Sequence, residues 1–199
     1  MKKISLLVLT SFLAMALFAQ NAKFGLKAGL NAATLSNNQG VDFNTKLGVH
    51  AGLLAHIHLA PSWALQPEIM YSSQGAKYTI SGAEHELGLN YVNIPLQVQY
   101  MFNNGFRLQT GPQIGILASV KDKLNDTETG NFTSDDFKSI DFAWSAGLGY
   151  LTYSGFGIDA RYNFGLSNIN EVGTNNLKNN VFQVGLFYML NNNHKAQSK

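Results

Sequence analysis

The sequence lacks cysteine, is poor in charge, and has no long apolar run after its first twenty residues. The absence of cysteine excludes disulfides, thiolate metal sites and cysteine nucleophiles. Only 13% of the residues are charged while 45% are hydrophobic, whereas soluble domains carry about 25% charged residues. Something other than water must therefore cover much of the surface.

The charge and hydropathy patterns exclude two further classes of protein. The net charge is only +2, and no basic run is interleaved with aromatic residues, so we expect no nucleic-acid partner. Beyond the N-terminal region no apolar run reaches the roughly 18 residues of a membrane-spanning helix. The N-terminus itself, MKKISLLVLTSFLAMALFAQ, has the charged, apolar and small-residue order of a secretory signal peptide. We therefore expect cleavage after Ala19.

The rest of the chain is built from segments that alternate between apolar and polar residues with the period of a β-strand. Eight such segments are predicted, at 23–35, 45–59, 63–74, 88–102, 106–120, 138–152, 156–167 and 179–190. Three connections have three residues, and two of these end in glycine, which adopts positive φ readily. The others are longer and polar, at 36–44, 75–87, 121–137 and 168–178. Alternation of short and long connections favours an antiparallel up-and-down sheet.

Side-chain parity supports this register, because each three-residue loop must join residues of the same face. The flanking pairs Leu59 and Trp63, Phe102 and Phe106, and Thr152 and Phe156 satisfy it. One face is aliphatic with aromatic residues near the hairpin ends, and the other carries mainly Gln, Asn, Ser and Gly. A face in water would carry more Lys and Glu, so the polar face is predicted to point inward.

These patterns predict an all-β fold, an eight-stranded antiparallel up-and-down transmembrane β-barrel with short periplasmic turns and long extracellular loops. The domain division is a signal peptide at 1–19, an outer-membrane β-barrel domain at 20–190 and a polar C-terminal tail at 191–199. A soluble lipid-binding barrel with an apolar interior is the alternative. An aromatic girdle at the membrane interfaces is predicted from Trp63, Tyr71, Phe102, Phe106, Trp144, Phe156, Tyr162 and Tyr188.

Several strand patterns are similar to those of a known family. They are FGLKAGLNAATL at 24–35, LQPEIMYSSQGA at 65–76, LNYVNIPLQVQYMF at 89–102, RLQTGPQIGILAS at 107–119, GIDARYNFGLSNI at 157–169 and the closing NNVFQVGLFYML. The mature chain resembles the PorT-like outer-membrane β-barrel family, often labelled porin family proteins. The resemblance implies the outer membrane of a Gram-negative cell. Its best-known member serves protein secretion, but no residue in these motifs identifies a secretion site.

Five charged residues fall on the predicted luminal face, Lys27, Glu68, Arg107, Asp159 and Arg161, and the last four are the ones expected to be buried. Glu68 and Arg161 lie at similar heights on opposite walls, and Gly147 opposite Arg161 leaves room for its side chain to lean inward. We expect an ion-pair network of Glu68 with Arg161, with Asp159 and Arg107 nearby, because a buried charge without a partner is costly. A structural plug is favoured over a gating or ion-relay role.

Two other sets of residues are candidates for chemistry. His50, His56 and His58 share a face, but no carboxylate or cysteine at suitable spacing completes a metal site. A lipid-modifying enzyme would need a nucleophile and an oriented base, and the candidates are His85 with Glu84 or Glu86 and Ser72, Ser73 or Ser81. Solvated loop residues are the favoured interpretation, so no catalytic residue, metal or cofactor is predicted.

The predicted function is that of a plugged, non-enzymatic outer-membrane barrel with a structural role or a binding role through its external loops. The alternatives are a lipid-modifying enzyme and a narrow channel for small solutes. Expected partners are outer-membrane lipid and lipopolysaccharide, the barrel-assembly machinery during insertion, and a protein bound through the loops. The last strand residues, Tyr188, Met189 and Leu190, are candidates for the assembly signal.

Overall fold

The computed structural model describes residues 22–38, 42–80, 82–124, 127–129, 132–172 and 175–190. The predicted signal peptide and polar tail lie outside these residues. No helix in this part of the chain is long and apolar enough to cross a membrane. The strands are β1 (Lys23–Asn37), β2 (Asn44–Ala60), β3 (Trp63–Ile80), β4 (Ala83–Met101), β5 (Phe106–Leu124), β6 (Thr127–Glu128), β7 (Ile140–Leu151), β8 (Phe156–Gly165) and β9 (Leu177–Met189), with a 3-10 turn at Ser134–Asp136.

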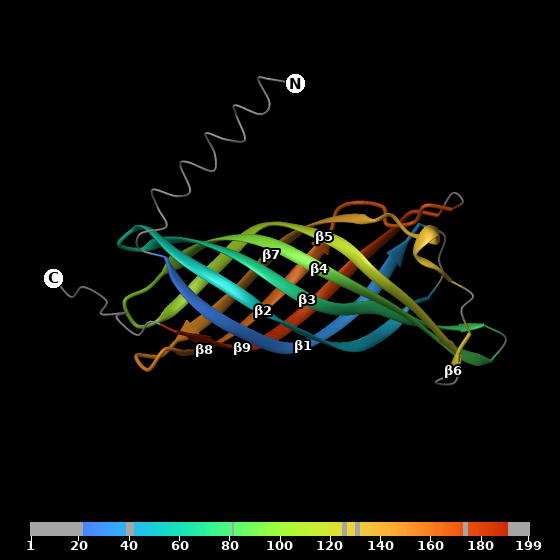
Figure 1. Cartoon of the computed structure of the whole chain (residues 1–199), viewed down its shortest axis with the longest axis horizontal. Helices are drawn as coiled ribbons and strands as arrows, with labels where there is room; N and C mark the ends of the chain where they lie inside the picture. Colours follow the sequence, from blue (N-terminus) through green and yellow to red (C-terminus); the bar gives the residue numbers. More distant parts are fainter. Residues whose placement is uncertain are drawn as a thin grey trace, which may run out of the picture.

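Eight of these strands form the closed antiparallel ring seen in Figure 1. Neighbours in the ring follow the chain order, and β9 pairs back onto β1, from Gly25 opposite Met189 to Asn37 opposite Leu177. The two-residue β6 pairs only with the end of β5. Closure gives every ring strand a hydrogen-bonded neighbour on both sides, as a sheet in lipid requires. The predicted all-β, eight-stranded up-and-down architecture is confirmed.

The barrel has two different ends. The end that we call the short-turn end carries the β2–β3, β4–β5 and β7–β8 turns, the start of β1 and the end of β9, and the opposite end is the long-loop end (Figure 1). At two of the short turns Met101 pairs with Arg107 and Leu151 with Gly157, as predicted. The glycines that end these turns have φ of 91° and 90°. Both the register and the glycine conformation predicted there are confirmed.

The third short turn differs slightly from the prediction. Ile57 pairs with Leu65 in the predicted register, but a shift near the turn places Ala60, instead of Leu59, opposite Trp63. The turn between the two strands is thereby shortened to Pro61 and Ser62. Proline has a fixed φ that suits the first central position of a tight turn.

The prediction that 75–87 is a long loop is wrong. β3 and β4 continue through it, Lys77 pairs with Glu86, and Ile80 pairs with Ala83. With 18 residues in β3 and 19 each in β4 and β5, against 10 in β8, these strands run past the others at the long-loop end (Figure 1). Within this stretch Ala76 and Leu87 belong to a buried apolar cluster in the lumen, but beyond the lipid the outer face needs no apolar residues, so a polar composition there is compatible with a strand.

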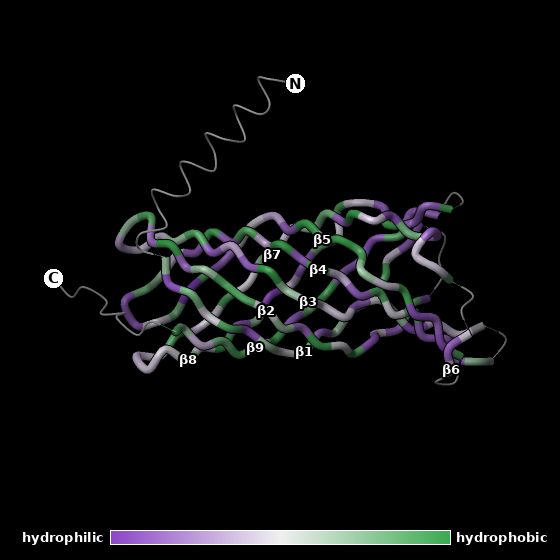
Figure 2. Tube along the Cα trace, in the orientation of Figure 1, coloured by the Kyte–Doolittle hydropathy of each residue, from purple (hydrophilic) through white to green (hydrophobic). Residues whose placement is uncertain are grey.

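The exposure of the two faces of the wall confirms the prediction that the polar face points inward and the apolar face outward. Figure 2 shows apolar and polar residues alternating along each strand. Outward apolar side chains such as Leu47 and Leu30 are 77% and 67% exposed, whereas the luminal amides of Gln97 and Gln99 are at most 1% exposed. A water-soluble barrel would have the reverse arrangement, because exposed apolar area is unfavourable in water. Lipid is the solvent that suits this exterior.

Apolar side chains fill the lumen on both sides of its polar middle. At the long-loop end one cluster comprises Leu35, Ala76, Leu87, Leu89, Tyr91, Phe137 and Ile169. Phe137 and Ile169 come from the connections after β5 and β8, so these loops fold inward over the barrel. At the short-turn end a second cluster comprises Leu54, Leu151, Phe187 and Met189.

Candidate functional site

Four charged side chains meet in the middle of the lumen, and we call them the charge quartet: Lys27 of β1, Glu68 of β3, and Asp159 and Arg161 of β8. Arg161 Nη2 lies 2.6 Å from Glu68 Oε2. Lys27 Nζ donates a hydrogen bond to Asp159 Oδ2 and lies 3.9 Å from Glu68 Oε1. Each of the four residues is at most 4% exposed. Two cations therefore neutralise two carboxylates inside the barrel.

Neutral amides hold the charge quartet in place. Gln66 Nε2 donates to Glu68 Oε1 at 2.8 Å, and Arg161 Nε donates to Gln183 Oε1 at 3.0 Å. Gln109 Nε2 donates to Asp159 Oδ2 at 3.3 Å. Hydrogen bonds to ionised groups are stronger than those between neutral groups. The amides thus stabilise the charges without adding further charge.

The amide network continues from the charge quartet toward the long-loop end. Gln183 Nε2 donates to Asn31 Oδ1 at 2.8 Å, and His50 Nδ1 lies 2.7 Å from the same oxygen. Asn31 Nδ2 in turn donates to Ser72 Oγ at 3.0 Å. Side chains of β9, β1, β2 and β3 are joined in this way, so the lumen is tied across the ring.

A glycine provides the space that the Arg161 side chain occupies. Gly147 pairs with Arg161 across the β7–β8 ladder, as predicted. A Cβ atom on Gly147 would lie only 2.6 Å from Arg161 Cβ. Any larger residue would force the two strands or the guanidinium to move.

Arg107, the fourth residue of the predicted network, stands apart from the charge quartet. Its Nη1 donates to Gln99 Oε1 at 3.3 Å, and its guanidinium lies 5.5 Å from the centre of the Phe187 ring. No carboxylate oxygen of the described residues lies within 4.0 Å of it, and Asp159 is bonded to Lys27. The structure thus brings together three of the four predicted residues and adds Lys27, which is predicted on the luminal face but not in the network.

The residues of the predicted aromatic girdle fall into two groups on the outer wall. Near the short turns lie Trp63, Phe102, Phe106, Phe156 and Tyr188, where the Phe156 and Tyr188 rings are 4.6 Å apart. Tyr71, Trp144 and Tyr162 lie several residues further along their strands. Trp144 Nε1 donates to Thr110 Oγ1 at 2.9 Å, so its N–H group is satisfied within the protein.

The three histidines of β2 do not converge on one point. His50 is bonded into the amide network, whereas the rings of His56 and His58 contact each other edge to face at 4.7 Å near the short-turn end. Among the described residues no group of three or more His, Cys, Asp or Glu side chains could hold a metal ion.

The candidate residues for an enzyme are also separated. His85 stacks on Tyr78, with ring centres 5.1 Å apart, at the long-loop tip of the barrel. Ser72 pairs with Tyr91, six positions along β4 from His85, which is about 20 Å at the rise of a strand. Ser73 lies 3.4 Å from Lys46 Nζ, Glu84 pairs with Lys77 at 2.8 Å and Glu86 lies 3.8 Å from Lys46 Nζ. Ser81 is outside the described residues, so no described serine meets the histidine.

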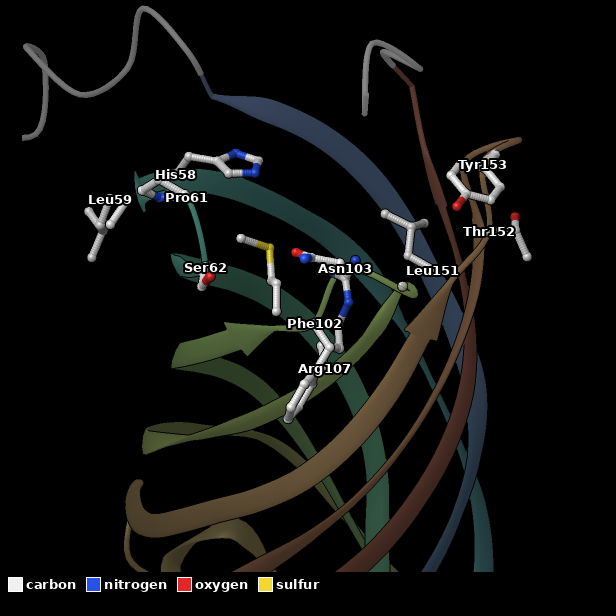
Figure 3. Close-up of a pocket in the computed structure, with 13 residues that line it drawn as sticks. His58, Leu59, Pro61, Ser62, Phe102, Asn103, Arg107, Leu151, Thr152 and Tyr153 are labelled. Carbon is white, nitrogen blue, oxygen red and sulfur yellow. The ribbon is translucent and has the colours of Figure 1, made fainter. Parts of the chain in front are cut away.

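A pocket of about 450 Å³ opens at the short-turn end (Figure 3). Figure 3 shows His58 on one side of its mouth, Tyr153 on the other and Arg107 deeper between them. Its walls come from the three short turns and the strand ends beside them: His58, Leu59, Ala60, Pro61, Ser62, Met101, Phe102, Asn103, Gly105, Arg107, Leu151, Thr152 and Tyr153. The sequence reasoning missed this pocket, because turns distant in the chain form it.

Comparison with known proteins identifies both a family and a fold. The family model described as outer membrane protein beta-barrel domain matches residues 18–171. A search of curated proteins finds no match. The family match covers most of the chain and includes β1 to β8.

Two solved structures illustrate the shared fold. Ail, the attachment invasion locus protein of Yersinia pestis, is 14% identical with a TM-score of 0.54, over 85% of this chain and 99% of Ail. Neisserial surface protein A is 17% identical with a TM-score of 0.52, over 84% of this chain and 98% of that protein. Ail has also been solved with the heparin analogue sucrose octasulfate, and that structure matches with a TM-score of 0.53 at 13% identity, over 85% of this chain and 99% of Ail. Identity this low supports the fold alone.

Proposed function

Because this chain belongs to the outer membrane protein beta-barrel domain family, we propose that it is a plugged, non-enzymatic barrel that binds a partner outside the cell through the hairpins of its long-loop end. The outer membrane is its location, and the short-turn end faces the periplasm. The observation that carries the binding role is the extension of β3, β4 and β5 beyond the other strands.

This extension is an ordered surface. Lys77 Nζ lies 2.8 Å from Glu84 Oε1, and Lys121 Nζ lies 3.1 Å from Glu128 Oε1. Burial and the nearby Asp122 carboxylate raise the pKa of Tyr78 to about 12, and its hydroxyl donates a hydrogen bond to Asp122 Oδ1 at 3.5 Å. A sheet held by ladder bonds and side-chain pairs loses little conformational freedom on binding, which favours affinity.

The charge of this end favours a basic partner. In the described segments carboxyl groups outnumber lysines, with Asp42, Glu84, Glu86, Asp122, Glu128, Asp135, Asp136, Asp141 and Glu171 against Lys46, Lys77, Lys121, Lys123, Lys138 and Lys178. Complementary potentials speed association and suppress partners of the wrong charge. A polyanion such as the heparin analogue bound by Ail is therefore not the ligand proposed for this end.

The plugged interior is supported by three layers across the lumen: the long-loop apolar cluster, the charge quartet with its amides, and the short-turn apolar cluster. An eight-stranded barrel has an interior just wide enough for side chains to fill. Continuous water passage would require several of these buried groups to move together.

Other parts of the proposal come from the sequence. Residues 1–19 would act as the signal peptide for export. Lipid and lipopolysaccharide would surround the outer wall, and the barrel-assembly machinery would recognise the end of β9. The strand patterns support kinship with the PorT-like group within the family, without a role in secretion.

Two measurements test the proposal. Purified protein in planar bilayers should show no ion-conducting steps, and well-defined open steps would contradict the plug. Labelled poly-lysine should bind vesicles containing the protein more tightly than labelled heparin does. The double variant Glu84→Gln/Glu86→Gln should weaken poly-lysine binding, whereas the matched Lys77→Gln/Lys121→Gln should not. Equal binding by the two variants would contradict an acidic binding surface.

A further inference from the structure

We propose that the pocket at the short-turn end binds a small organic acid from the periplasm, with its carboxylate at Arg107 and its apolar body against the surrounding turns. This site lies at the opposite end of the barrel from the hairpin surface, so its test is independent of the proposed function.

The first argument is the charge balance of the lumen. Lys27 and Arg161 are matched by Asp159 and Glu68, and each carboxylate is contacted by a cation. Arg107 is an additional guanidinium, 4% exposed, with no carboxylate oxygen of the described residues within 4.0 Å, and Asp159 acts on it only from a longer distance. Burying a charge without a partner is strongly unfavourable. An anion that enters from the periplasm would provide the missing partner.

The second argument is the unused hydrogen-bonding capacity of Arg107. Nη1 donates to Gln99, but Nε has no acceptor among the described residues. A guanidinium presents its N–H groups as a planar fork that fits both oxygens of a carboxylate. The Phe187 ring beneath the guanidinium, 5.5 Å away, holds it by a cation–π contact. The fork is therefore held in place and incompletely used.

The third argument is the positive character of the pocket. None of its 13 lining residues is a carboxylate. Lys23 and Arg107 both interact electrostatically with His58 at the mouth. Apart from Glu68 and Asp159, every Asp and Glu of the described residues lies toward the long-loop end. An anion approaching from the periplasm thus meets cations and no opposing carboxylate at the mouth.

The fourth argument is size and lining. The pocket of about 450 Å³ includes Met101, Phe102, Leu151 and Tyr153 beside its polar groups. Small-molecule sites are typically about 300 to 1,000 Å³, mainly apolar, with a few polar groups that fix orientation. These features fit an acid with one ring or a short chain better than inorganic phosphate.

The C-terminal tail is the competing occupant that the sequence offers. Residues 191–199 follow β9 at the same end and carry Lys195 and Lys199 with no Asp or Glu. These residues offer no side-chain carboxylate, and their lysines would be repelled by Arg107. We therefore favour an external acid over the tail.

The test uses the mature full chain in lipid nanodiscs and 4-fluorobenzoate as the probe, followed by ¹⁹F NMR. We expect saturable binding, competition by benzoate, and no binding of the neutral 4-fluorobenzyl alcohol. Arg107→Gln should weaken binding about tenfold or more, because a hydrogen bond to a charged group is lost, and Arg107→Lys should retain part of it. Ser62→Trp, which keeps Arg107 and narrows the pocket, should also weaken binding. Lys121→Gln, at the other end, is the matched control and should bind as the unmodified chain does.

Each other outcome overturns the proposal. Absence of saturable binding by the folded full chain, or equal affinity in folded Arg107→Gln, would exclude the site. If phenyl phosphate bound more tightly than benzoate, the site would be a phosphate site and the proposed carboxylate ligand would be wrong. Binding that appears only after deletion of residues 191–199 would identify the tail as the occupant. The heat-resistant mobility of each variant on gels confirms that it is folded.

Discussion

Replacing Glu68 with glutamine should destabilise the barrel more than replacing its partner Arg161 with glutamine. Glu68 Oε2 lies 2.6 Å from Arg161 and Glu68 Oε1 lies 3.9 Å from Lys27, so the carboxylate serves two cations. Removing one partner of a buried pair costs about 3 to 5 kcal/mol. The residues around the pair decide which removal is worse.

Arg107 makes the difference between the two variants. In Glu68→Gln three luminal cations, Lys27, Arg107 and Arg161, face Asp159 alone. In Arg161→Gln two cations face two carboxylates, and Lys27 remains 3.9 Å from Glu68. We therefore expect a loss of about 3 to 5 kcal/mol for Glu68→Gln and about 1 to 3 kcal/mol for Arg161→Gln.

The assay is urea unfolding in lipid vesicles, followed by tryptophan fluorescence and by the gel mobility of the folded form. Gln97→Met is the matched control, because Gln97 is buried without a protein hydrogen-bond partner among the described residues and methionine has a similar shape. It should change the free energy of unfolding by less than about 1 kcal/mol. A larger loss in Arg161→Gln than in Glu68→Gln, or losses below 1 kcal/mol in both, would refute the charge-balance reasoning.

Three further predictions follow from other parts of the wall. A Cβ on Gly111 would lie 1.9 Å from the Leu96 carbonyl oxygen, so Gly111→Ala should reduce the folded fraction after refolding, whereas Gly88→Ala, with its nearest neighbour at 3.5 Å, should not. Val184→Arg, on the lipid-facing wall, should cost about 2 to 4 kcal/mol in urea unfolding, while Val172→Arg in an exposed loop should leave stability unchanged. The pKa of Tyr78 is raised to about 12, so the contribution of Tyr78 to stability is complete below pH 10 and is lost as the pH rises from about 10 to about 12. The absorbance titration at 295 nm, taken as the difference from Tyr78→Phe, should show this pKa. Asp122→Asn should lower the pKa of Tyr78.

The sequence predicted the wall of the barrel well because the relevant signals are local. Strand alternation and short glycine-ended turns fix which residues face each other, and the pairs Met101–Arg107 and Leu151–Gly157 follow from them. The error at 75–87 has the same origin. Its polar composition predicts a loop, although a strand that lies beyond the lipid needs no apolar outer face, and only Ala76 and Leu87 of this stretch join the buried cluster inside.

The contents of the lumen depend on contacts that no local pattern encodes. Lys27 reaches Asp159 only because β9 closes onto β1, and this places β1 and β8 on either side of β9. Lys27 holds Asp159, and no carboxylate oxygen of the described residues lies within 4.0 Å of Arg107. The sequence predicts which charged residues face the lumen, but it does not predict which cation pairs with which carboxylate.

The small number of luminal charges follows from the cost of each one in a narrow barrel. Gln and Asn fill most of the middle because an amide both donates and accepts, so neighbouring amides can satisfy one another without a fixed partner. An ion needs a specific counter-ion within a few ångströms, as the four members of the charge quartet have. Arg107, which has no counter-ion of the described residues within 4.0 Å and lies beside an open pocket, is an exception to this rule. Such exceptions are where a function is expected, because packing and hydrogen bonding alone would favour a neutral side chain at that position.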